Sequence, residues 1–461
     1  MLQTHRISNQ HPPVPAWTRR MAPLLCVFVL MACRAPMAQA PDEGDHAAQE
    51  AVAPAAVTRA LEVRLRKAMA ARDLVAIEAV GAEANRALGA RAGVPEVADR
   101  YRPMPRGVAP LSAAEAAAVV APALDRLQTL RWWKVGLDPT ALGHPLREPA
   151  EAVVGALAMR DASPQDAERA LAIAIEAGDV LLWAQREAGN GVFPFPASRG
   201  ASDAPPFRAA ERFLKRAERD GRLAQVVRNG WLIDDLGDGG LQFDNGECGA
   251  AMLALYDATG EARYRDAAQR AADWALAQPL SANWNYNSFS VYLLAQTYRR
   301  TGETRYRDAA LDKARYGVIP GQLRDGPNVG RWYDPHNARP AYHYIMLRAL
   351  AALAPQLPAA SDERREIETA LRLGLYARNR DFIGPGAPNL DHAIQTLLMV
   401  DALTRDDPTM AGIFKETQSA EALTAVRAFA AQAARAGRFQ LAPRAFGLLL
   451  ADAARPAAAL R

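Results

Sequence analysis

Four segments of this chain concentrate aromatic, amide and ionisable side chains: residues 229–247, 283–288, 330–344 and 388–392. Aromatic rings stack on sugar rings, amides and carboxylates hydrogen-bond to hydroxyl groups, and arginine pairs with a carboxylate through two parallel bonds. Together these groups indicate a site for a glycan substrate. The predicted substrate-binding residues are Asn285, Trp284, Trp231, Glu247, Arg331, Trp332, His336, Asn337 and His392.

The densest group of acids is Asp234, Asp235, Asp238, Asp244 and Glu247. Carboxylates that lie close together have their pKa values pushed apart, so that one can donate a proton while another accepts one. The alternative is that they cap helices and turns, since Asp-Gly and Asn-Gly are ordinary turn sequences. We expect at least two of the five to be structural.

No cofactor is required by this chemistry, although a divalent cation such as calcium could bridge the acidic group and the substrate. The EF-hand pattern does not fit the segment, because Leu236 occupies a ligand position. A His-Glu-x-x-His zinc motif and a Gly-x-Ser-x-Gly nucleophile motif are both missing from the sequence.

The elements that must position these loops are indicated by an internal repeat. Residues 259–268 read Thr-Gly-Glu-Ala-Arg-Tyr-Arg-Asp-Ala-Ala, and residues 301–310 read the same except for one threonine, an offset of 42 residues. The same offset pairs Tyr256 with Tyr298. Each copy predicts an apolar helix, a tight turn and a second helix, which is an αα-hairpin. Looser copies lie at 342–378 and 391–434, and an earlier hairpin runs through 148–187.

Such hairpins bury their apolar faces only by stacking, either as an open solenoid or as a closed ring. The long polar loops between hairpins favour the ring. We therefore predict an all-α fold: an α/α toroid, an incomplete barrel of helical hairpins, with an N-terminal helical extension. The predicted parts are a signal peptide at 1–40, the extension and linker at 41–110, and the toroid at 111–461. All the long loops should then share one face.

Export is indicated by Arg19 and Arg20, the apolar run 23–33 and the small residues up to Ala40. The run Leu-Met-Ala-Cys ending at Cys33 resembles a lipoprotein box, which would give a lipid anchor at Cys33. Ala38-Gln-Ala40 fits ordinary signal peptidase instead. We expect an exported protein: periplasmic, an outer-membrane lipoprotein or secreted. No other stretch is long and apolar enough to predict a transmembrane segment.

Charge argues against nucleic acid as a partner. Of the 55 basic residues, four arginines lie within residues 1–40, which contain no acid, so 51 basic residues face 51 acidic ones in the remainder. A neutral chain has no electrostatic attraction for a polyanion. Cys248 has no cysteine partner outside the targeting segment, and we expect it to be a small buried hydrophobic residue.

The Thr-Gly-Glu-x-Arg-Tyr hairpins resemble those of α/α-toroid carbohydrate enzymes, which include the alginate and pectate lyases and the unsaturated glucuronyl hydrolases. The resemblance covers residues 230–345. Residues 339–344, Arg-Pro-Ala-Tyr-His-Tyr, look like the Arg…Tyr-His-x-Tyr stretch of the toroid alginate lyases. Asn283-Trp-Asn-Tyr-Asn287 lies where their Asn-Asn-His segment would, but no histidine follows here. Trp231-Leu-Ile-Asp-Asp235 looks instead like the Trp-x-Asp-Asp segment of the glucuronyl hydrolases.

The lyase resemblance implies β-elimination on a uronic-acid-containing glycan, which is our leading expectation. Asn285 or Asn287, with Arg339, would neutralise the uronate carboxylate and so acidify the C5 proton, which Tyr342 or His343 would remove.

Two alternatives remain open. The hydrolase resemblance implies that Asp235 or Asp244 protonates a group on the sugar while a second carboxylate activates water. The third hypothesis is a non-catalytic surface protein that only binds glycan. It ranks lowest, because sugar binding alone rarely needs so many titratable groups.

Overall fold

A computed structural model describes residues 52–95, 103–130, 146–189, 191–193, 219, 241–384, 390–438 and 441–455. Within these ranges the chain is helical, and the only β-type pairing is an isolated antiparallel bridge between Gln322 and Trp332. None of the described helices is long and apolar enough to cross a bilayer. The predicted targeting segment 1–40 lies outside the described residues, so export and the anchor at Cys33 stay predictions.

The two copies of the repeat form the predicted αα-hairpins. The first pairs α8 (Leu241–Thr259) with α9 (Ala262–Ala277), and the second pairs α10 (Trp284–Thr301) with α11 (Thr304–Gly317). Gly260 and Gly302 both take the left-handed conformation, with φ of 71°, and their amides donate to carbonyls of the preceding turn. Glycine has no Cβ to oppose this conformation, so it ends each first helix cleanly.

The Arg-Tyr part of the repeat joins each outer helix to the one before it. Tyr264 donates its hydroxyl hydrogen to Asp179, which also pairs with Arg263 at 2.9 Å. One repeat later, Tyr306 donates to Asp273 at 2.8 Å and Arg305 pairs with the same carboxylate. The motif therefore connects neighbouring hairpins and belongs to the framework of the fold.

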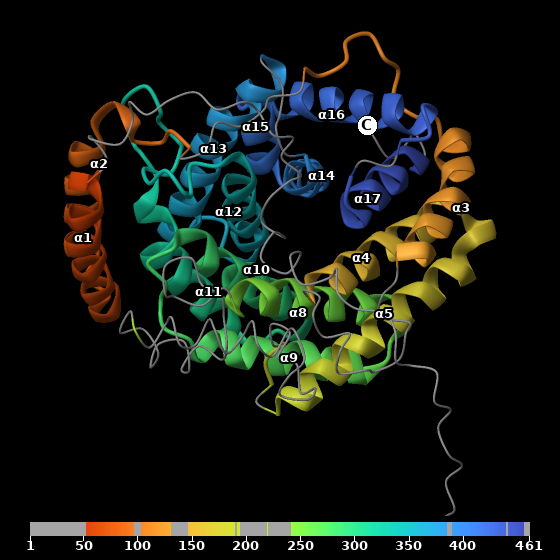
Figure 1. The fold of residues 1–461 in the computed structure, drawn as a ribbon, viewed down its shortest axis with the longest axis horizontal. Coiled ribbons are helices and arrows are strands. Elements are labelled where there is room, and N and C mark those ends of the chain that lie inside the picture. Colours follow the sequence, from red (N-terminus) through yellow and green to blue (C-terminus); the bar gives the residue numbers. More distant parts are fainter. Residues whose placement is uncertain are drawn as a thin grey trace, which may run out of the picture.

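The hairpins close into a ring, which confirms the predicted α/α toroid (Figure 1). The inner layer consists of α4 (Arg147–Ala162), α8, α10, α12 (Pro340–Leu353), α14 (Asp391–Leu403) and α17 (Pro443–Ala454). Each of these helices packs on the next, and α17 packs on α4. At that last contact a Cβ on Gly447 would lie 2.3 Å from the Gly155 carbonyl oxygen, so the two backbones meet with no room for a side chain.

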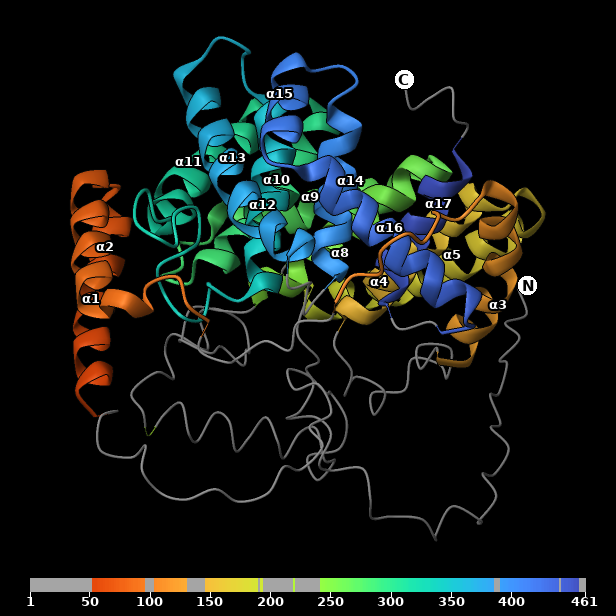
Figure 2. The same cartoon turned by 90° about the horizontal axis from the view of Figure 1, so that it is seen from above.

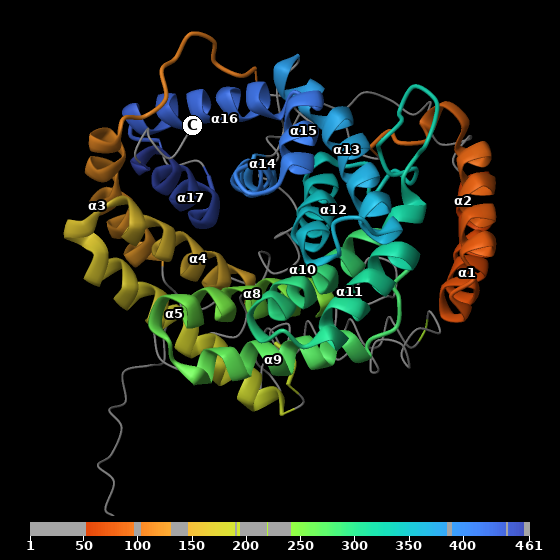
Figure 3. The ribbon, with the colours of Figure 1, turned by 180° about the vertical axis from the view of Figure 1, so that it is seen from behind.

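The outer layer places at least one helix on each inner helix. It consists of α5 (Ala167–Ala188) on α4, α9 on α8, α11 on α10, α13 (Asp362–Ile383) on α12, α15 (Pro408–Glu416) and α16 (Ser419–Arg435) on α14, and α3 (Ala113–Leu130) on α17. Because α3 precedes the ring in sequence but completes its last pair, the two ends of the toroid are joined. Figure 3 shows this arrangement from behind.

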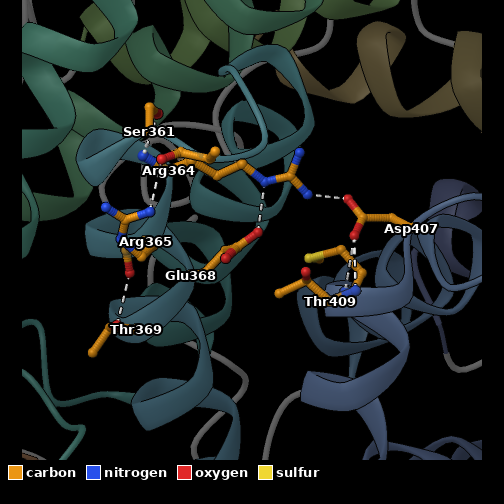
Figure 4. Close-up of polar contacts among 9 residues, drawn as sticks. Ser361, Arg364, Arg365, Glu368, Thr369, Asp407 and Thr409 are labelled. Carbon is orange, nitrogen blue, oxygen red and sulfur yellow. Dashed lines mark hydrogen bonds and ion pairs between the residues drawn. The ribbon is translucent and has the colours of Figure 1, made fainter.

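Arg364 at the start of α13 links two consecutive hairpins (Figure 4). Its guanidinium pairs with Glu368 at 2.6 Å and also with Asp407. Asp407 in turn accepts hydrogen bonds from the amides of Thr409 and Met410 in the first turn of α15. Asp407 thus both caps the N-terminus of α15 and forms an ion pair with α13.

The predicted N-terminal extension forms a helical hairpin of α1 (Val52–Ala71) and α2 (Leu74–Leu88), followed by the 3-10 turn η1 (Gly89–Arg91). It lies beside the ring, next to α11 (Figure 2). Arg72 pairs with Asp312 of α11 at 2.7 Å, and Asn328 donates to the carbonyl of Ala92. The extension therefore supports the long loop that leads into α12. The predicted boundary near residue 110 stays a prediction.

The turns within the hairpins of α8–α9 and α10–α11 are short, and the loop into α12, residues 318–339, is long, as predicted. The connection 278–283 between α9 and α10 is an exception, because it is shorter than the connection 354–361 within the hairpin of α12 and α13. The turns inside hairpins include the 3-10 helices η4 (Pro164–Asp166) and η6 (Ala354–Gln356), and the loop into α12 contains η5 (Ile319–Gly321). Since the inner helices follow one another around the ring in hairpin order, the loops that enter their N-terminal ends lie on the same face.

Candidate active site

Ionisable side chains from the inner helices gather at one place inside the ring. They come from the first two turns of α4, α8, α14 and α17 and from the middle of α10 and α12. Their charges or hydrogen bonds act on one another. The cluster, called the axial cluster below, consists of Arg147, Glu151, Asp244, Glu247, Tyr292, Arg348, Asp391, His392, Gln395 and Arg444.

Glu247 is the centre of this cluster. Its two carboxylate oxygens pair with different arginines: Arg348 donates to Oε1 at 2.6 Å, and Arg444 donates to Oε2. All three side chains are buried. Burial by itself would raise the pKa of Glu247, but the two guanidinium groups hold that pKa well below its ordinary value. Glu247 therefore stays ionised.

Arg348 is held by groups from three neighbouring helices. Besides Glu247, its guanidinium donates to Oε1 of Gln395 at 2.8 Å and lies 4.2 Å from the ring centroid of Tyr292. A buried ion pair needs such additional partners to offset the cost of removing two charges from water. The Arg348–Glu247–Arg444 group thus connects α12, α8 and α17 across the interior of the ring.

Two other acids of the cluster, Glu151 and Asp244, have raised pKa values, in contrast to Glu247. Burial raises the pKa of Glu151 to about 7, against a weaker effect of Arg444, whose Nη2 lies 3.6 Å away. Burial also raises the pKa of Asp244 to about 6. Among the described residues, Oδ1 of Asp244 has no hydrogen-bond partner. Near neutral pH Glu247 is thus ionised, whereas Glu151 and Asp244 can exchange protons.

His392 supplies a neutral imidazole at the edge of the cluster. Burial, with Arg444 and Arg348 nearby, lowers its pKa to about 3. Within the described part of the chain, Nδ1 of His392 has no hydrogen-bond partner. The adjacent Asp391 accepts a hydrogen bond from the amide of Ala442 at 3.0 Å, which fixes the start of α14 against the start of α17.

A second, separate polar group lies where α10 and α12 begin. Asn285 donates to Asn283 at 2.8 Å and to Asn337 at 2.9 Å, and Asn337 donates to Asp334 at 2.9 Å. The three amides are buried, and burial raises the pKa of Asp334. These bonds join the loop before α10 to the loop before α12, so Asn285 and Asn337 meet each other but not the axial cluster.

The predicted tryptophans pack inside this loop region. Trp284 contacts Tyr333 edge to face, with ring centroids 5.9 Å apart, and leaves no room for a Cβ on Gly321. Trp332 donates its indole hydrogen to the carbonyl of Val318 at 2.8 Å. Both rings are almost completely buried. They stabilise the loop in this structure, and their predicted contact with substrate stays a prediction.

Asn287 and His343 are also buried, with their polar atoms directed at the backbone. The Asn287 side chain donates to the carbonyls of Ser281 and Gly317 and accepts from the Ser281 amide. His343 Nε2 lies 3.0 Å from the Gly330 carbonyl, and burial lowers the pKa of its imidazole. Both residues hold loops in place here. Their predicted catalytic roles are not tested by this geometry.

The remaining candidates from residues 330–344 are only half-buried. The rings of His336 and Tyr342 lie 4.7 Å apart, and the guanidinium of Arg339 lies 5.0 Å from the Tyr342 ring centroid. Arg331 pairs with Asp381 at 3.4 Å. His336, Arg339 and Tyr342 therefore form a compact stack that is more accessible than His343, although His343 follows Tyr342 directly in sequence.

Sequence reasoning found Asp244, Glu247 and His392, which the fold brings together. It did not find Glu151 on α4, Arg348 on α12 or Arg444 on α17. A signal for Arg348 exists, because it is the only charge in the apolar run 345–354, and a charge on a buried helix face needs a partner. The predicted residues Trp231 and Asp235, like Asp234 and Asp238, lie outside the described residues.

Two other predictions concern cysteine and metal. Cys248 is fully buried on α8, and burial raises the pKa of its thiol, which agrees with the predicted hydrophobic role. In the described ranges, no group of three or more His, Cys, Asp or Glu side chains is placed to hold a metal ion. The suggested divalent cation at residues 234–247 is not tested, since Asp234, Asp235 and Asp238 lie outside the described residues.

The ring of inner and outer helices with an ionisable cluster on its axis defines this chain as an α/α-toroid protein. No protein-family model matches the sequence, and no curated protein matches it. Among solved structures, the glycosyl hydrolase family 88 protein from Bacteroides vulgatus is similar in fold, with a TM-score of 0.46 and 12% sequence identity. The alignment covers 75% of this chain and 98% of that chain.

Proposed function

We propose that this protein is a carbohydrate-processing enzyme that hydrolyses glycosidic bonds at the axial cluster. The observation that carries the proposal is the pair of acids with raised pKa values, Glu151 and Asp244, beside the permanently ionised Glu247. Glycoside hydrolysis typically needs one carboxyl group that is protonated near neutral pH and a second that is ionised. The reaction is that of the hydrolase alternative from the sequence, but the proton donor is now Glu151, and Asp244, one of the donors suggested by the sequence, becomes the base.

The pKa values suggest which acid does which task. Midway between the two pKa values, of about 7 for Glu151 and about 6 for Asp244, most of Glu151 is protonated and most of Asp244 is ionised. Glu151 would donate a proton to the glycosidic oxygen as the bond from that oxygen to the anomeric carbon breaks. Asp244 would accept a proton from the water whose oxygen attacks the anomeric carbon. Water is the only other reactant.

Three arginines around these acids favour an acidic sugar as the substrate. Arg348 and Arg444 pair with Glu247, while the charge of Arg147 acts on Asp244 and its guanidinium lies over the ring of Phe243, 4.6 Å from the ring centroid. Arginine binds carboxylates through a planar pair of donors. In the proposed complex Arg147 also binds a uronate carboxylate next to Glu151, which lies one helical turn further along α4.

The test is an assay of the full chain on oligosaccharides that end in a 4,5-unsaturated uronate, followed by loss of the ultraviolet absorbance of that group. Glu151→Gln and Asp244→Asn should each reduce the rate by at least about 100-fold, because each removes a proton transfer. The matched control is Glu421→Gln, an exposed glutamate on the outer helix α16. Wild-type rates in both active-site variants would refute the assignment.

β-Elimination, the leading expectation from sequence, stays a second candidate because Arg339, Tyr342 and His336 form an accessible stack. In that reaction Tyr342 would remove the C5 proton of a uronate whose carboxylate pairs with Arg339. The C4–C5 double bond would form as the C4–O bond breaks, and the proton would pass to the departing oxygen. The same assay on intact polyuronates would then show a rise of the absorbance. A rise that Tyr342→Phe abolishes and Glu151→Gln leaves intact would favour elimination over hydrolysis.

A further inference from the structure

Away from the axial cluster, a groove runs between the end of α5 and one face of α9. Its volume is about 570 Å³. It is lined by Leu182, Gln185, Arg186, Gly189, Gly191, Arg263, Asp266 and Arg270. The charged side chains of the lining are three arginines and one aspartate. We propose that this groove binds an acidic oligosaccharide through its sulfate or carboxylate groups, as a second site distinct from the axial cluster.

The charges of the lining do not cancel one another. Arg263 is neutralised by Asp179 at 2.9 Å and Glu261 at 2.6 Å, and Asp266 is neutralised by Arg265 at 2.9 Å. Arg270 donates instead to Oε1 of Gln185, at 2.9 Å from Nη2, and pairs with no carboxylate among the described residues. An arginine held by a neutral amide keeps its full positive charge for an anionic ligand.

Gln185 is held rigidly in the lining of the groove and positions Arg270. Its side chain is buried, and its Nε2 donates to the carbonyls of Gly191 and Ala267 at 2.7 and 2.8 Å. With both of its amide hydrogens used, its Oε1 must accept from Arg270, so the guanidinium is held in position before any ligand arrives. Such preorganisation reduces the entropy that binding would otherwise cost.

The residue that corresponds to Arg270 in the second copy of the repeat has the opposite charge. At the offset of 42 residues, Arg263 corresponds to Arg305 and Asp266 to Asp308, but Arg270 corresponds to Asp312. Asp312 pairs with Arg72, which the turn between α1 and α2 supplies. The position on α11 is thus an acid that receives a cation from another segment. Its counterpart on α9 is a cation, which points to an anion as its partner.

The size of the groove favours a sugar chain over a single inorganic ion. Small-molecule sites usually have volumes of several hundred Å³, and this groove lies in that range. Gly189 and Gly191, with φ of 74° and 81°, have no side chains that could project into the groove beside the arginines. A sugar ring can therefore lie along the backbone while its anionic group reaches Arg270 and Arg186.

Isothermal titration calorimetry on the full chain tests this proposal with three probes: an oligogalacturonate, a sulfated chondroitin oligosaccharide and a neutral cello-oligosaccharide. Arg270→Gln should weaken one acidic-sugar site about tenfold or more, and added salt should weaken the same site. The two acidic probes tell whether carboxylate or sulfate is preferred. Arg299→Gln, an exposed arginine at the end of α10 that lies outside the groove, is the matched control.

Hydrolysis by Arg270→Gln should equal that of the wild type on short substrates, so failure of this site and failure of the proposed function are separable. Arg186→Gln is the second variant, to be used if Arg270→Gln lowers the melting temperature. Unchanged binding of both acidic probes by a folded Arg270→Gln and a folded Arg186→Gln would overturn the proposal. So would equal affinity for the neutral probe, or no binding of either acidic probe by the wild type.

Discussion

Glu151 and Glu247 lie in the same cluster, yet the fold moves their pKa values in opposite directions. Both are desolvated, and desolvation disfavours the charged form of a carboxyl group. Glu247 has an arginine on each oxygen, so its pKa falls, whereas Arg444 lies 3.6 Å from Glu151 and compensates only in part. The difference between a permanent charge and a proton donor thus depends on the distance to a guanidinium.

This difference predicts a pH-dependent stability. Because the pKa of Glu151 is raised from 4.5 to about 7, its contribution to folding is fully present below pH 4.5 and is lost as the pH rises through 7. Glu151→Gln removes that dependence. Urea unfolding should show the wild type losing on the order of 3 kcal/mol relative to the variant between pH 4 and pH 8.

Glu421→Gln on α16 should show no such change across the same pH range. A constant difference in the free energy of unfolding between wild type and Glu151→Gln, from pH 4 to pH 8, would contradict the raised pKa of Glu151.

The first helix of each repeat copy ends in the same three-residue turn sequence, Thr-Gly-Glu. In the first copy, Thr259 donates its hydroxyl hydrogen to the Leu255 carbonyl and accepts from the Glu261 amide, while Gly260 reverses the chain direction with a positive φ. The second copy repeats these contacts at Thr301, Gly302 and Glu303. The turn is therefore fixed locally, before any contact with the rest of the ring.

Gly260→Ala should lower the free energy of unfolding by about 1–2 kcal/mol, because alanine resists the left-handed conformation. No heavy atom lies within 4 Å of the added Cβ, so the cost comes from the backbone alone. Gly412→Ala is the control: this glycine lies inside α15, also with open space, and alanine there should be neutral or stabilising by up to about 1 kcal/mol. Equal effects of the two substitutions in urea titrations would refute this explanation.

The closed ring depends on the contact between the first and last inner helices. Gly155 on α4 and Gly447 on α17 let the two backbones touch, and a Cβ at Gly155 would lie 2.4 Å from the Pro443 carbonyl oxygen. On the outside, Arg435 of α16 pairs with Glu115 of α3 at 2.8 Å, so the outer layer is also joined across this seam. Residues far apart in sequence thereby complete the cluster that contains Glu151 and Arg444.

Gly447→Ala should therefore destabilise the whole protein, by about 1–3 kcal/mol or more, because backbone atoms must move to admit the methyl group. Hydrogen exchange should accelerate first in α4 and α17. Gly81→Ala is the control, since its Cβ would meet only ordinary contacts at 3.5 Å. If hydrogen exchange in α4 and α17 of Gly447→Ala stays at wild-type rates, the contact between these two helices does not stabilise the ring.

The sequence by itself determined the local elements. The offset of 42 residues identified the hairpins of α8 to α11, and Thr259-Gly-Glu261 marked their turns, because helix periodicity and a glycine at a helix end are local properties of the chain. Asp244, Glu247 and His392 were also recognisable, since they belong to sequence segments dense in polar residues.

Only the tertiary structure decided which polar residues meet. Glu151, Arg348 and Arg444 are nearly 300 residues apart at the extremes and sit on apolar helices, so nothing local relates them until the ring closes. Asn287 and His343 are residue types that are common in catalytic sites, but here their side chains make hydrogen bonds to backbone carbonyls. Burial and the distance to an opposite charge set a group's pKa, and both are properties of the folded ring.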